Sequence, residues 1–508
     1  MTQNKIWRIS SGLLPAVAAA ALVVPATQAT AVSAANPAPA VSPTALPTFP
    51  YGGPPGDPYA CMAADVVGCS IVFGGSGIPI PHQNYIDAVN ERFIQPLHPG
   101  FTPQALFTPE GLQPFTGVKT LPLDVSMAQG LTMLQLAAQN QFDLGHAVNL
   151  YGYSQSASID TLLMRQYLAL PADQRPDADQ LTFTFLGNPN TPNGGLMQIF
   201  NLPEFGGSVP IASLGLTLNG ATPDGPWATN NYTLEYDGFA DFPRYPLNLL
   251  ASLNAVAGIV YTHIQYPMLP MTPDGQLANA ILLPGSVDYA GELPDGVTAS
   301  TATNYWMIPT ENLPLLEPFR GSPFGNAIAD LVQPALRVLV NLGYGQIEHG
   351  WDAGPANVPT TMGLFPDVNP TDVFTALVNG AQQGWQDFVQ DLGSLSSAVA
   401  DGPDAGVDVA AFTMPSLIDI ANAFSGSISA VNGLAMVTGD ILNALSTTLP
   451  AAMAQVFLSE LSQGDLVDAF GLPMAAATGL GSLAAGFEVV GIMHAVSQIQ
   501  AEWAGLFG

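Results

Sequence analysis

The chain has 508 residues, of which 48% are hydrophobic and only 9% are charged. This composition predicts a large buried core and argues against a disordered chain, and the length is enough for two folded units with terminal segments. The formal net charge of −30 argues against nucleic acid as a partner and against electrostatic docking on anionic lipid, because both need clustered Lys and Arg. A neutral or apolar ligand fits this composition better.

The N-terminus has the pattern of an export signal. Lys5 and Arg8 precede a short apolar run, and the small residues at 29–34 suit a signal peptidase. We therefore expect a signal peptide over residues 1–34 and a secreted or cell-envelope-associated protein, with an uncleaved anchor as the alternative. Residues 35–60, rich in Pro and Ala, are expected to form an extended tether. We expect no later segment to span a bilayer.

The chain has two cysteines, Cys61 and Cys69, which are eight positions apart. In an oxidising compartment such a pair most simply forms a disulfide that closes a small loop. Free buried thiols are the alternative. Because no cluster of histidines lies near the pair, it does not predict a metal site.

From Cys69 onward the sequence alternates between strand and helix patterns. Expected strands cover residues 70–73, 147–151, 181–186 and 232–236. Expected helices cover residues 84–94, 126–142, 159–170, 247–262 and 328–342. Strands separated by helical stretches of this length predict parallel crossovers and a covered sheet, so the expected fold class is α/β with helices on both faces.

A region of different character begins after residue 350. Residues 338–508 contain no Lys or Arg but sixteen Asp or Glu. Helical patterns cover residues 371–393, 415–447, 451–469 and 484–506. Such helices cannot use acid–base pairs along their surface, so their stability must come from packing. We expect residues 351–508 to form a small helical domain or a helical jacket on the preceding domain.

The segment Gly152-Tyr153-Ser154-Gln155-Ser156 fits the nucleophile turn of a serine hydrolase. Such a turn needs a strand before it, a helix after it, and small residues two positions before and after the serine. Gly152 and Ser156 supply the small residues, and the predicted strand and helix are correctly placed. Ser154 is therefore the expected nucleophile. The alternative is an ordinary strand–helix turn with a solvated serine.

The expected base and acid follow Ser154 in the chain. Hydrolases of this fold have the order Ser, acid, His, which sets aside the three histidines before Ser154. His263 is the expected base, in a loop after a helical stretch, and His349 is its rival. Asp241, just past a predicted strand, is the preferred acid, and Asp237 is the alternative.

Two backbone N–H groups are expected to stabilise the oxyanion. Gln155, the residue after the nucleophile, supplies one of them. The Gly-rich loop 74–77 is the natural source of the second, at Ser76, whose hydroxyl is a further possible donor. The alternative for this loop is a tight turn that needs glycine for its backbone alone. As a phosphate-binding loop it is weak, because no Walker lysine accompanies it.

The stretch 70–345 resembles the PE-PPE domain of mycobacteria and related actinobacteria. The segments that carry the resemblance are 72–77, 152–156, 185–190, 235–238, 240–243 and 308–310. The resemblance implies a serine α/β-hydrolase fold related to cutinases, over residues 61–350, and an esterase or acyltransferase that acts on acylated envelope lipids. Cutinases share the Gly-Tyr-Ser-Gln turn and a His-x-x-Tyr step, which His263 and Tyr266 match. We find no PE or PPE helical module before the domain.

The sequence therefore predicts an exported serine esterase or lipase that acts on acyl esters through Ser154, His263 and Asp241. No metal or organic cofactor is required, and the expected partner is a lipid or acyl-ester substrate. One alternative is an acyltransferase that moves acyl chains onto a trehalose-type glycolipid. Another is a non-catalytic envelope-binding protein with the acidic C-terminal region as its working part.

Overall fold

A computed structural model of the chain describes residues 61, 66–113, 115–117, 120–201, 208–272, 277–320, 323–398 and 416–507. All of these residues belong to one compact unit, Pro50–Gly508. The expected signal peptide, 1–34, and the expected tether, 35–60, lie outside the described residues.

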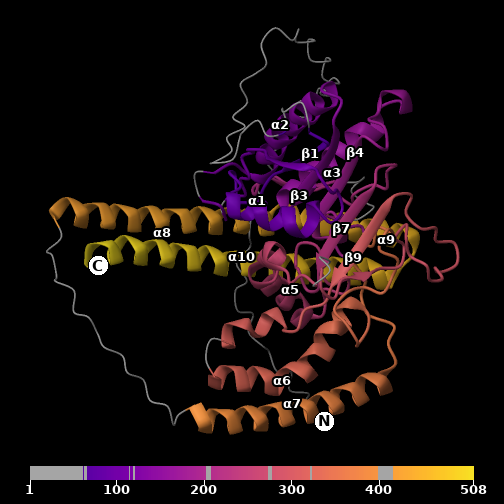
Figure 1. Cartoon of the computed structure of the whole chain (residues 1–508). Helices are drawn as coiled ribbons and strands as arrows, with labels where there is room; N and C mark the ends of the chain where they lie inside the picture. Colours follow the sequence, from indigo (N-terminus) through magenta and orange to yellow (C-terminus); the bar gives the residue numbers. More distant parts are fainter. Residues whose placement is uncertain are drawn as a thin grey trace, which may run out of the picture. The chain divides into compact units, whose positions relative to one another are not determined.

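A seven-stranded sheet forms the centre of the described chain (Figure 1), with the strand order β2-β1-β3-β4-β7-β9-β8. Its strands are β1 (Gly68–Val72), β2 (Thr102–Ala105), β3 (Ala147–Tyr153), β4 (Leu181–Leu186), β7 (Thr229–Leu234), β8 (Ile281–Leu282) and β9 (Thr303–Ile308). Every neighbouring pair is parallel except β8–β9. This confirms the expected α/β-hydrolase-like fold with a mostly parallel sheet.

Helices cover both faces of the sheet. Successive side chains of a strand point to opposite faces, so neighbouring residues of one strand pack against different helices. Ile71 and Phe73 belong to a core cluster with residues of α2 and α3, whereas Val72 belongs to a second cluster with residues of α1 and η2. These helices are α1 (Gln83–Val89), the π-helical turn η2 (Asn90–Ile94), α2 (Leu123–Asp143) and α3 (Gln155–Ala169). A parallel sheet that is buried on both faces explains the continuous apolar runs of its central strands.

Three strands of the sheet, β2, β8 and β9, have no counterpart among the strands expected from the sequence. β2 contains Pro103, which cannot donate a backbone hydrogen bond, and the structure places this strand at the edge of the sheet. β9 begins with Thr303-Asn304, a polar pair that hides its strand pattern. A short antiparallel hairpin, β5 (Val209–Ile211) and β6 (Leu216–Leu218), also lies outside the main sheet.

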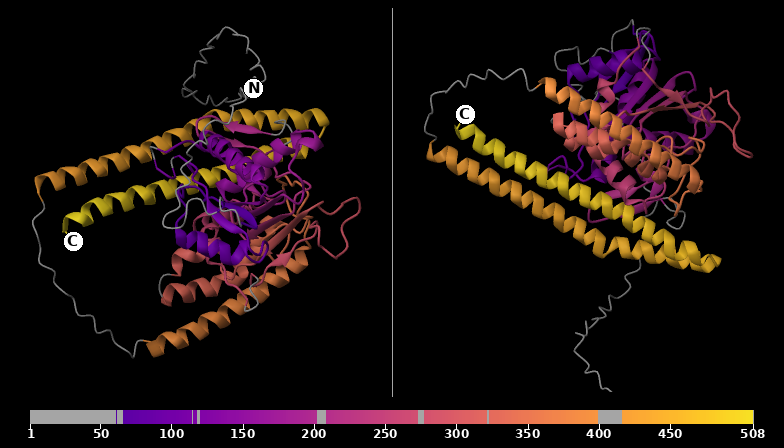
Figure 2. Two further views of the ribbon diagram at one scale, coloured as in Figure 1. Left: turned by 45° about the horizontal axis from the view of Figure 1, so that its top comes forward. Right: turned by 90° about the horizontal axis from the view of Figure 1, so that it is seen from below.

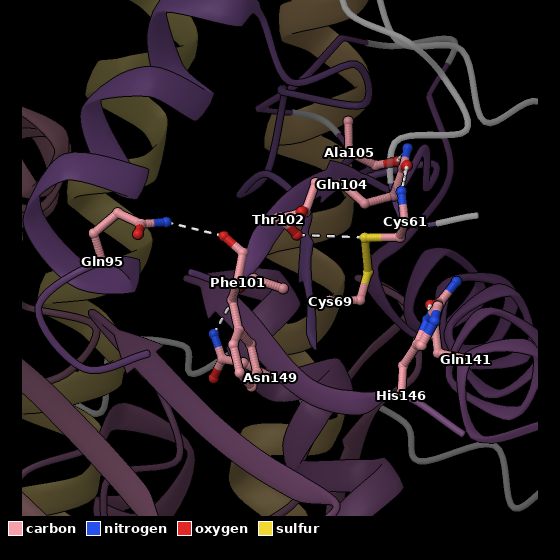
Figure 3. The surroundings of a disulfide bond; sticks show 11 residues. Cys61, Cys69, Gln95, Phe101, Thr102, Gln104, Ala105, Gln141, His146 and Asn149 are labelled. Carbon is pink, nitrogen blue, oxygen red and sulfur yellow. Dashed lines mark hydrogen bonds between the residues drawn. A yellow bond between two sulfur atoms is a disulfide. The ribbon is translucent and has the colours of Figure 1, made fainter. Parts of the chain in front are cut away.

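A disulfide joins Cys61 to Cys69, the pair expected to bond (Figure 3). Cys69 lies in β1, and Cys61 is held beside β2, where its N–H donates to the Gln104 side chain at 3.4 Å. Both cysteines are fully buried. Closing so short a loop reduces the entropy of the unfolded chain and stabilises the fold by about 2–3 kcal/mol. The bond therefore fixes the start of the sheet.

The C-terminal region is helical. It comes after α6 (Pro323–Asn341) and contains α7 (Pro370–Ala398), α8 (Leu417–Ser446), α9 (Thr448–Gln463) and α10 (Leu466–Phe507). Figures 1 and 2 show α7 alongside α6 and α10 alongside α8. The expected break between 469 and 484 is absent, since α10 is one helix of 42 residues that contains Pro473. Gly464, with φ +85°, separates α9 from α10 instead.

Helices α8 to α10 pack on the α/β domain as a jacket. Two glycines of α10 allow this close approach, because a Cβ at Gly479 would lie 2.6 Å from the Phe200 ring and a Cβ at Gly486 would lie 2.0 Å from Val256. On α8, the backbone oxygen of Asp440 accepts a hydrogen bond from Ser213 at 3.0 Å. The C-terminal helices thus share their packing with the α/β domain.

The outward faces of these helices are apolar. Ile418–Gln463 and Leu466–Trp503 each have a mean hydropathy of 1.4. Only 17% and 22% of their most apolar windows are buried. By length and composition alone, both segments meet the requirement for crossing a membrane. The expectation that no later segment is long and apolar enough to do so is therefore wrong.

Candidate active site

Ser154 lies in a strained turn between β3 and α3. Its backbone has φ +61° and ψ −118°, a conformation that residues with a side chain rarely adopt. Ser156 stabilises the turn, since its Oγ accepts from the Tyr153 N–H at 2.7 Å and its hydroxyl donates to the Tyr153 oxygen at 2.9 Å. This explains why a serine serves at a position where glycine is usual. The strain presents the Ser154 side chain at the carboxyl edge of the sheet.

Two glycines near Ser154, Gly152 before it in the chain and Gly75 in the Gly-rich loop, leave little room for a side chain. A Cβ at Gly152 would lie 2.7 Å from the backbone of Ala157 and 2.4 Å from Asp160 Oδ2, so the strand and helix could not meet. A Cβ at Gly75 would lie 3.0 Å from Ser154 Cβ. Gly152 thus lets α3 approach β3, and Gly75 lets the Gly-rich loop approach the nucleophile.

His263 is paired with Asp237. Its Nδ1 lies 2.7 Å and 2.9 Å from the two carboxylate oxygens of Asp237. His263 begins the 3₁₀ turn η5 (His263–Met268), after α5 (Leu249–Tyr261), and Asp237 follows β7. Asp237 is fully buried and His263 is 5% exposed. A buried carboxylate on Nδ1 fixes the orientation of the imidazole and favours an acceptor lone pair at Nε2.

The preference for Asp241 as the acid does not agree with this geometry. Asp241 Oδ2 accepts instead from the Tyr236 N–H at 2.8 Å, and Tyr236 has φ +65°. Burial raises the pKa of the Asp241 carboxyl well above its usual range, and nearby Glu235 adds to the rise. Asp241 therefore holds a strained turn, and this turn directs its neighbour Asp237 toward His263.

Three aromatic side chains hold the acid–histidine pair in place. The Tyr153 ring stacks on the imidazole at 5.1 Å, and its hydroxyl donates to the His263 backbone oxygen at 2.7 Å. The Tyr266 hydroxyl donates to Asp237 Oδ2 at 2.7 Å, and Phe239 meets the imidazole edge-to-face. Of these residues, only Tyr266 could be predicted, from the His-x-x-Tyr step; Tyr153 and Phe239 come from elements far apart in the chain.

Ser154 and His263 line the same cavity. His263 Nε2 is buried and has no hydrogen-bond partner among the described residues. A base that is oriented at one nitrogen and unpaired at the other is ready to take a proton in this cavity. The rival His349 lines neither this cavity nor the second one at Ser154, and it stacks instead on Trp351 with ring centroids 3.6 Å apart.

The loop expected to supply the oxyanion donors lies beside Ser154. Ser76 lines the same cavities as Ser154, and its hydroxyl donates to Gln155 Oε1 at 2.8 Å. The hydroxyl is thus already used, so it is not a free third donor. Gln155 is the first residue of α3, where a backbone N–H has no acceptor within the helix. The backbone N–H groups of Ser76 and Gln155 are the two remaining candidates.

A buried acid supports the Gly-rich loop. The Glu110 backbone oxygen accepts from the Gly77 N–H at 2.8 Å, and its carboxyl accepts from the Thr108 hydroxyl at 2.6 Å. Burial raises the pKa of Glu110 to about 8, from an ordinary value of 4.5. The nearby Asp160 carboxyl is also fully buried, and its pKa is raised as well.

These shifts predict a loss of stability as the pH rises. The folded protein binds the Glu110 proton more tightly than the unfolded chain, so this contribution is complete below about pH 4.5 and disappears toward pH 8. Glu110→Gln cannot ionise, so we expect its free energy of unfolding to gain on the wild type between pH 5 and pH 8. Urea denaturation at both pH values measures this. An unchanged difference between the two proteins would contradict it, and Glu292→Gln, at an exposed position, is the control.

Within the described ranges, no group of three or more His, Cys, Asp or Glu side chains is placed to hold a metal ion. Ser154, His263 and Asp237 are side chains of the types that can supply a nucleophile, a base and an orienting acid.

The strand order, the strained serine turn and the buried acid–histidine pair are those of an α/β-hydrolase-like fold. Among known sequences, residues 99–345 match the PE-PPE domain family, so the chain contains a PE-PPE domain. The match begins after the Gly-rich loop at 74–77. No solved structure matches the chain.

Several relatives come from Mycobacterium tuberculosis strain H37Rv. The uncharacterised PPE family protein PPE28 is 43% identical over 85% of this chain and 66% of its own length. Esterase PE16 is 43% identical over 58% of this chain and 51% of its own length. Diacyltrehalose acyltransferase Chp2 is 25% identical over 64% of this chain and 88% of its own length. The chain thus spans about half to two thirds of the length of PE16 and PPE28.

The similarity to PPE28 reaches beyond the family domain. A match over 85% of 508 residues leaves about 76 residues unmatched, which is fewer than the 158 residues of 351–508. Part of the C-terminal helical region therefore has a counterpart in this relative, and the resemblance of the chain to known proteins does not end at residue 345.

Proposed function

We propose that this protein is a serine enzyme that transfers the acyl group of a lipidic ester through an acyl-enzyme at Ser154. The observation that carries the proposal is the strained Ser154 in one cavity with His263, whose Nδ1 is 2.7 Å from the buried Asp237 carboxylate. The relatives named esterase and acyltransferase support the same chemistry. Its place of action is proposed to be outside the cell or in the envelope.

The proposed reaction has two halves. Ser154 Oγ attacks the ester carbonyl carbon while His263 Nε2 takes the hydroxyl proton, and Asp237 stabilises the imidazolium. The backbone N–H groups of Ser76 and Gln155 stabilise the oxyanion. His263 returns the proton to the departing alcohol as the ester bond breaks. Water or a second alcohol, deprotonated by His263, then attacks the acyl-enzyme, and His263 returns the proton to Ser154 Oγ as the acyl bond breaks.

Two outcomes of the second half define two candidate functions. Attack by water gives an esterase, as in the name of PE16, and attack by a sugar hydroxyl gives an acyltransferase, as in the name of Chp2. We favour the esterase, because the relative named for it is 43% identical to this chain and the named acyltransferase is 25% identical.

Product analysis tests this choice. The full chain is incubated with p-nitrophenyl palmitate with and without trehalose or glycerol, and the products are separated by mass spectrometry. An esterase is expected to give free palmitate in both cases, whereas palmitoyl trehalose or palmitoyl glycerol as main product would establish transfer. Absence of p-nitrophenol release together with absence of fluorophosphonate labelling of Ser154 would favour a non-catalytic envelope-binding protein and overturn both.

A further inference from the structure

A second cavity at Ser154 is formed jointly by the α/β domain and the C-terminal helices; we call it the apolar cavity. Ser76, Ser154 and Gln155 lie at its reactive part. The α/β domain adds Leu196, Met197, Phe200 and the β5–β6 hairpin. Its remaining wall comes from three helices: α8 at Val437 and Ile441, α9 at Met453 and Val456, and α10 at Ala476 and Leu483.

The chemistry of this wall is uniform. No charged residue lines the apolar cavity in the part of the chain that the structure describes, and three of its six polar residues, Ser76, Ser154 and Gln155, belong to the nucleophile turn and the adjacent loop. Alanines face the space from all three helices, at Ala444, Ala452 and Ala476. Larger side chains at these positions would fill it. An uncharged space beside a nucleophile favours a hydrocarbon chain, since each methylene moved out of water favours binding about fourfold.

The other cavity at Ser154, which we call the histidine cavity, is different. It contains His263, Tyr153, Thr116 and, from α10, His494 and Gln498. It is lined by no residue of α9 among those described. Ser154 therefore lies where an apolar cavity meets a more polar one. The two sides of an ester differ in the same way, with a hydrocarbon chain on the carbonyl carbon and an oxygen-rich alcohol on the other side.

We propose that the apolar cavity binds the acyl chain of the substrate, so that α8, α9 and α10 form part of the acyl site. The alcohol of the ester occupies the histidine cavity, where His263 protonates it. This inference rests on the proposed function and adds the substrate class, esters of long-chain fatty acids. It also assigns a role to residues outside the matched domain, 99–345.

Filling the apolar cavity tests the proposal. Ala452→Trp and Ala476→Trp place an indole in the apolar cavity, whereas Ala454→Trp and Ala485→Trp place it on exposed faces of the same two helices. For the filled variants we expect kcat/KM for p-nitrophenyl palmitate to fall at least tenfold while that for p-nitrophenyl butyrate changes less than threefold. The two controls are expected to match the wild type with both esters. Equal changes with both esters, or no change with either, would overturn the proposal.

A second measurement uses the wild-type full chain and does not depend on the variants folding. A fluorophosphonate with a long alkyl chain and a terminal diazirine is attached to Ser154 and then photolysed. The products are digested with endoproteinase Glu-C and Asp-N, because 338–508 contains no Lys or Arg for trypsin. Crosslinks in α9 are expected, since α9 lines only the apolar cavity.

The outcomes separate this inference from the proposed function. Labelling of Ser154 with crosslinks only around Thr116 or His263 would overturn the acyl site and leave the serine chemistry standing. Failure to label Ser154 at all would instead overturn the proposed function and the inference with it. Labelling together with α9 crosslinks supports both.

Discussion

Replacing Ser154 by alanine is expected to lower kcat for p-nitrophenyl butyrate hydrolysis by about 10⁵- to 10⁶-fold, to the rate of the blank reaction. The variant removes the only atom that forms the acyl bond in the proposed reaction, Oγ. It also removes the site of fluorophosphonate labelling. The measurement is a progress curve with and without protein, together with mass spectrometry of the labelled chain.

The turn at Ser154 makes this variant a clean test. Alanine at φ +61° is as strained as serine, and the Ser154 side chain makes no capping hydrogen bond to the start of α3. The fold should therefore be unaffected, and circular dichroism checks this. Ser462→Ala, an exposed hydroxyl on α9, is the control and should keep wild-type activity. Wild-type turnover in Ser154→Ala would show that another nucleophile acts.

The same substitution is expected to lower kcat strongly at one of the two aspartates after β7 and to leave it nearly unchanged at the other. Asp237→Asn should lower kcat by about 10⁴-fold, because an amide cannot stabilise the imidazolium and favours the wrong tautomer of His263. Asp241→Asn should keep activity within a few-fold, because its amide oxygen can still accept from the Tyr236 N–H. The kcat values of the two variants with p-nitrophenyl butyrate decide between them.

The role of Asp241 in the turn can be tested through the free energy of unfolding. Asp241→Ala leaves the buried Tyr236 N–H without its acceptor, which costs about 1–3 kcal/mol of unfolding free energy. Urea denaturation of Asp241→Ala and Asp241→Asn measures this difference. If Asp241→Asn is inactive at unchanged stability while Asp237→Asn is active, the acid is Asp241 and the pairing with Asp237 has no catalytic role.

The strained turn at Ser154 and the position of His263 in the same cavity could be predicted, because each depends on local sequence and chain order. Ser154 follows an apolar run and precedes an amphipathic pattern, and His263 follows the acid loop. The choice between Asp237 and Asp241 could not be made in this way, since both lie just past the same strand. It depends on the positive φ of Tyr236, which cannot be predicted from the presence of a tyrosine in the sequence.

The C-terminal region could also be predicted only in part from the sequence. Its helices could be predicted from composition, but Pro473 and Gly479 lie between 469 and 484, where a break was expected and the structure has a continuous helix. The glycines of α10 serve packing, since Gly479 and Gly486 lie against Phe200 and Val256 of the α/β domain. Contacts between residues more than two hundred positions apart leave no local pattern from which they could be predicted.

The close packing of α10 also bears on how the protein can be divided in the laboratory. A fragment that ends near residue 350 would keep every strand of the sheet and the Ser154, His263 and Asp237 set. It would lose α10, which covers Phe200 and Val256, together with α9, and so would lose Val456, Ala475 and Leu483 of the main core. The freshly exposed apolar surface would favour aggregation. The boundary of the family domain is therefore not a boundary for folding, and expression should retain the chain through α10.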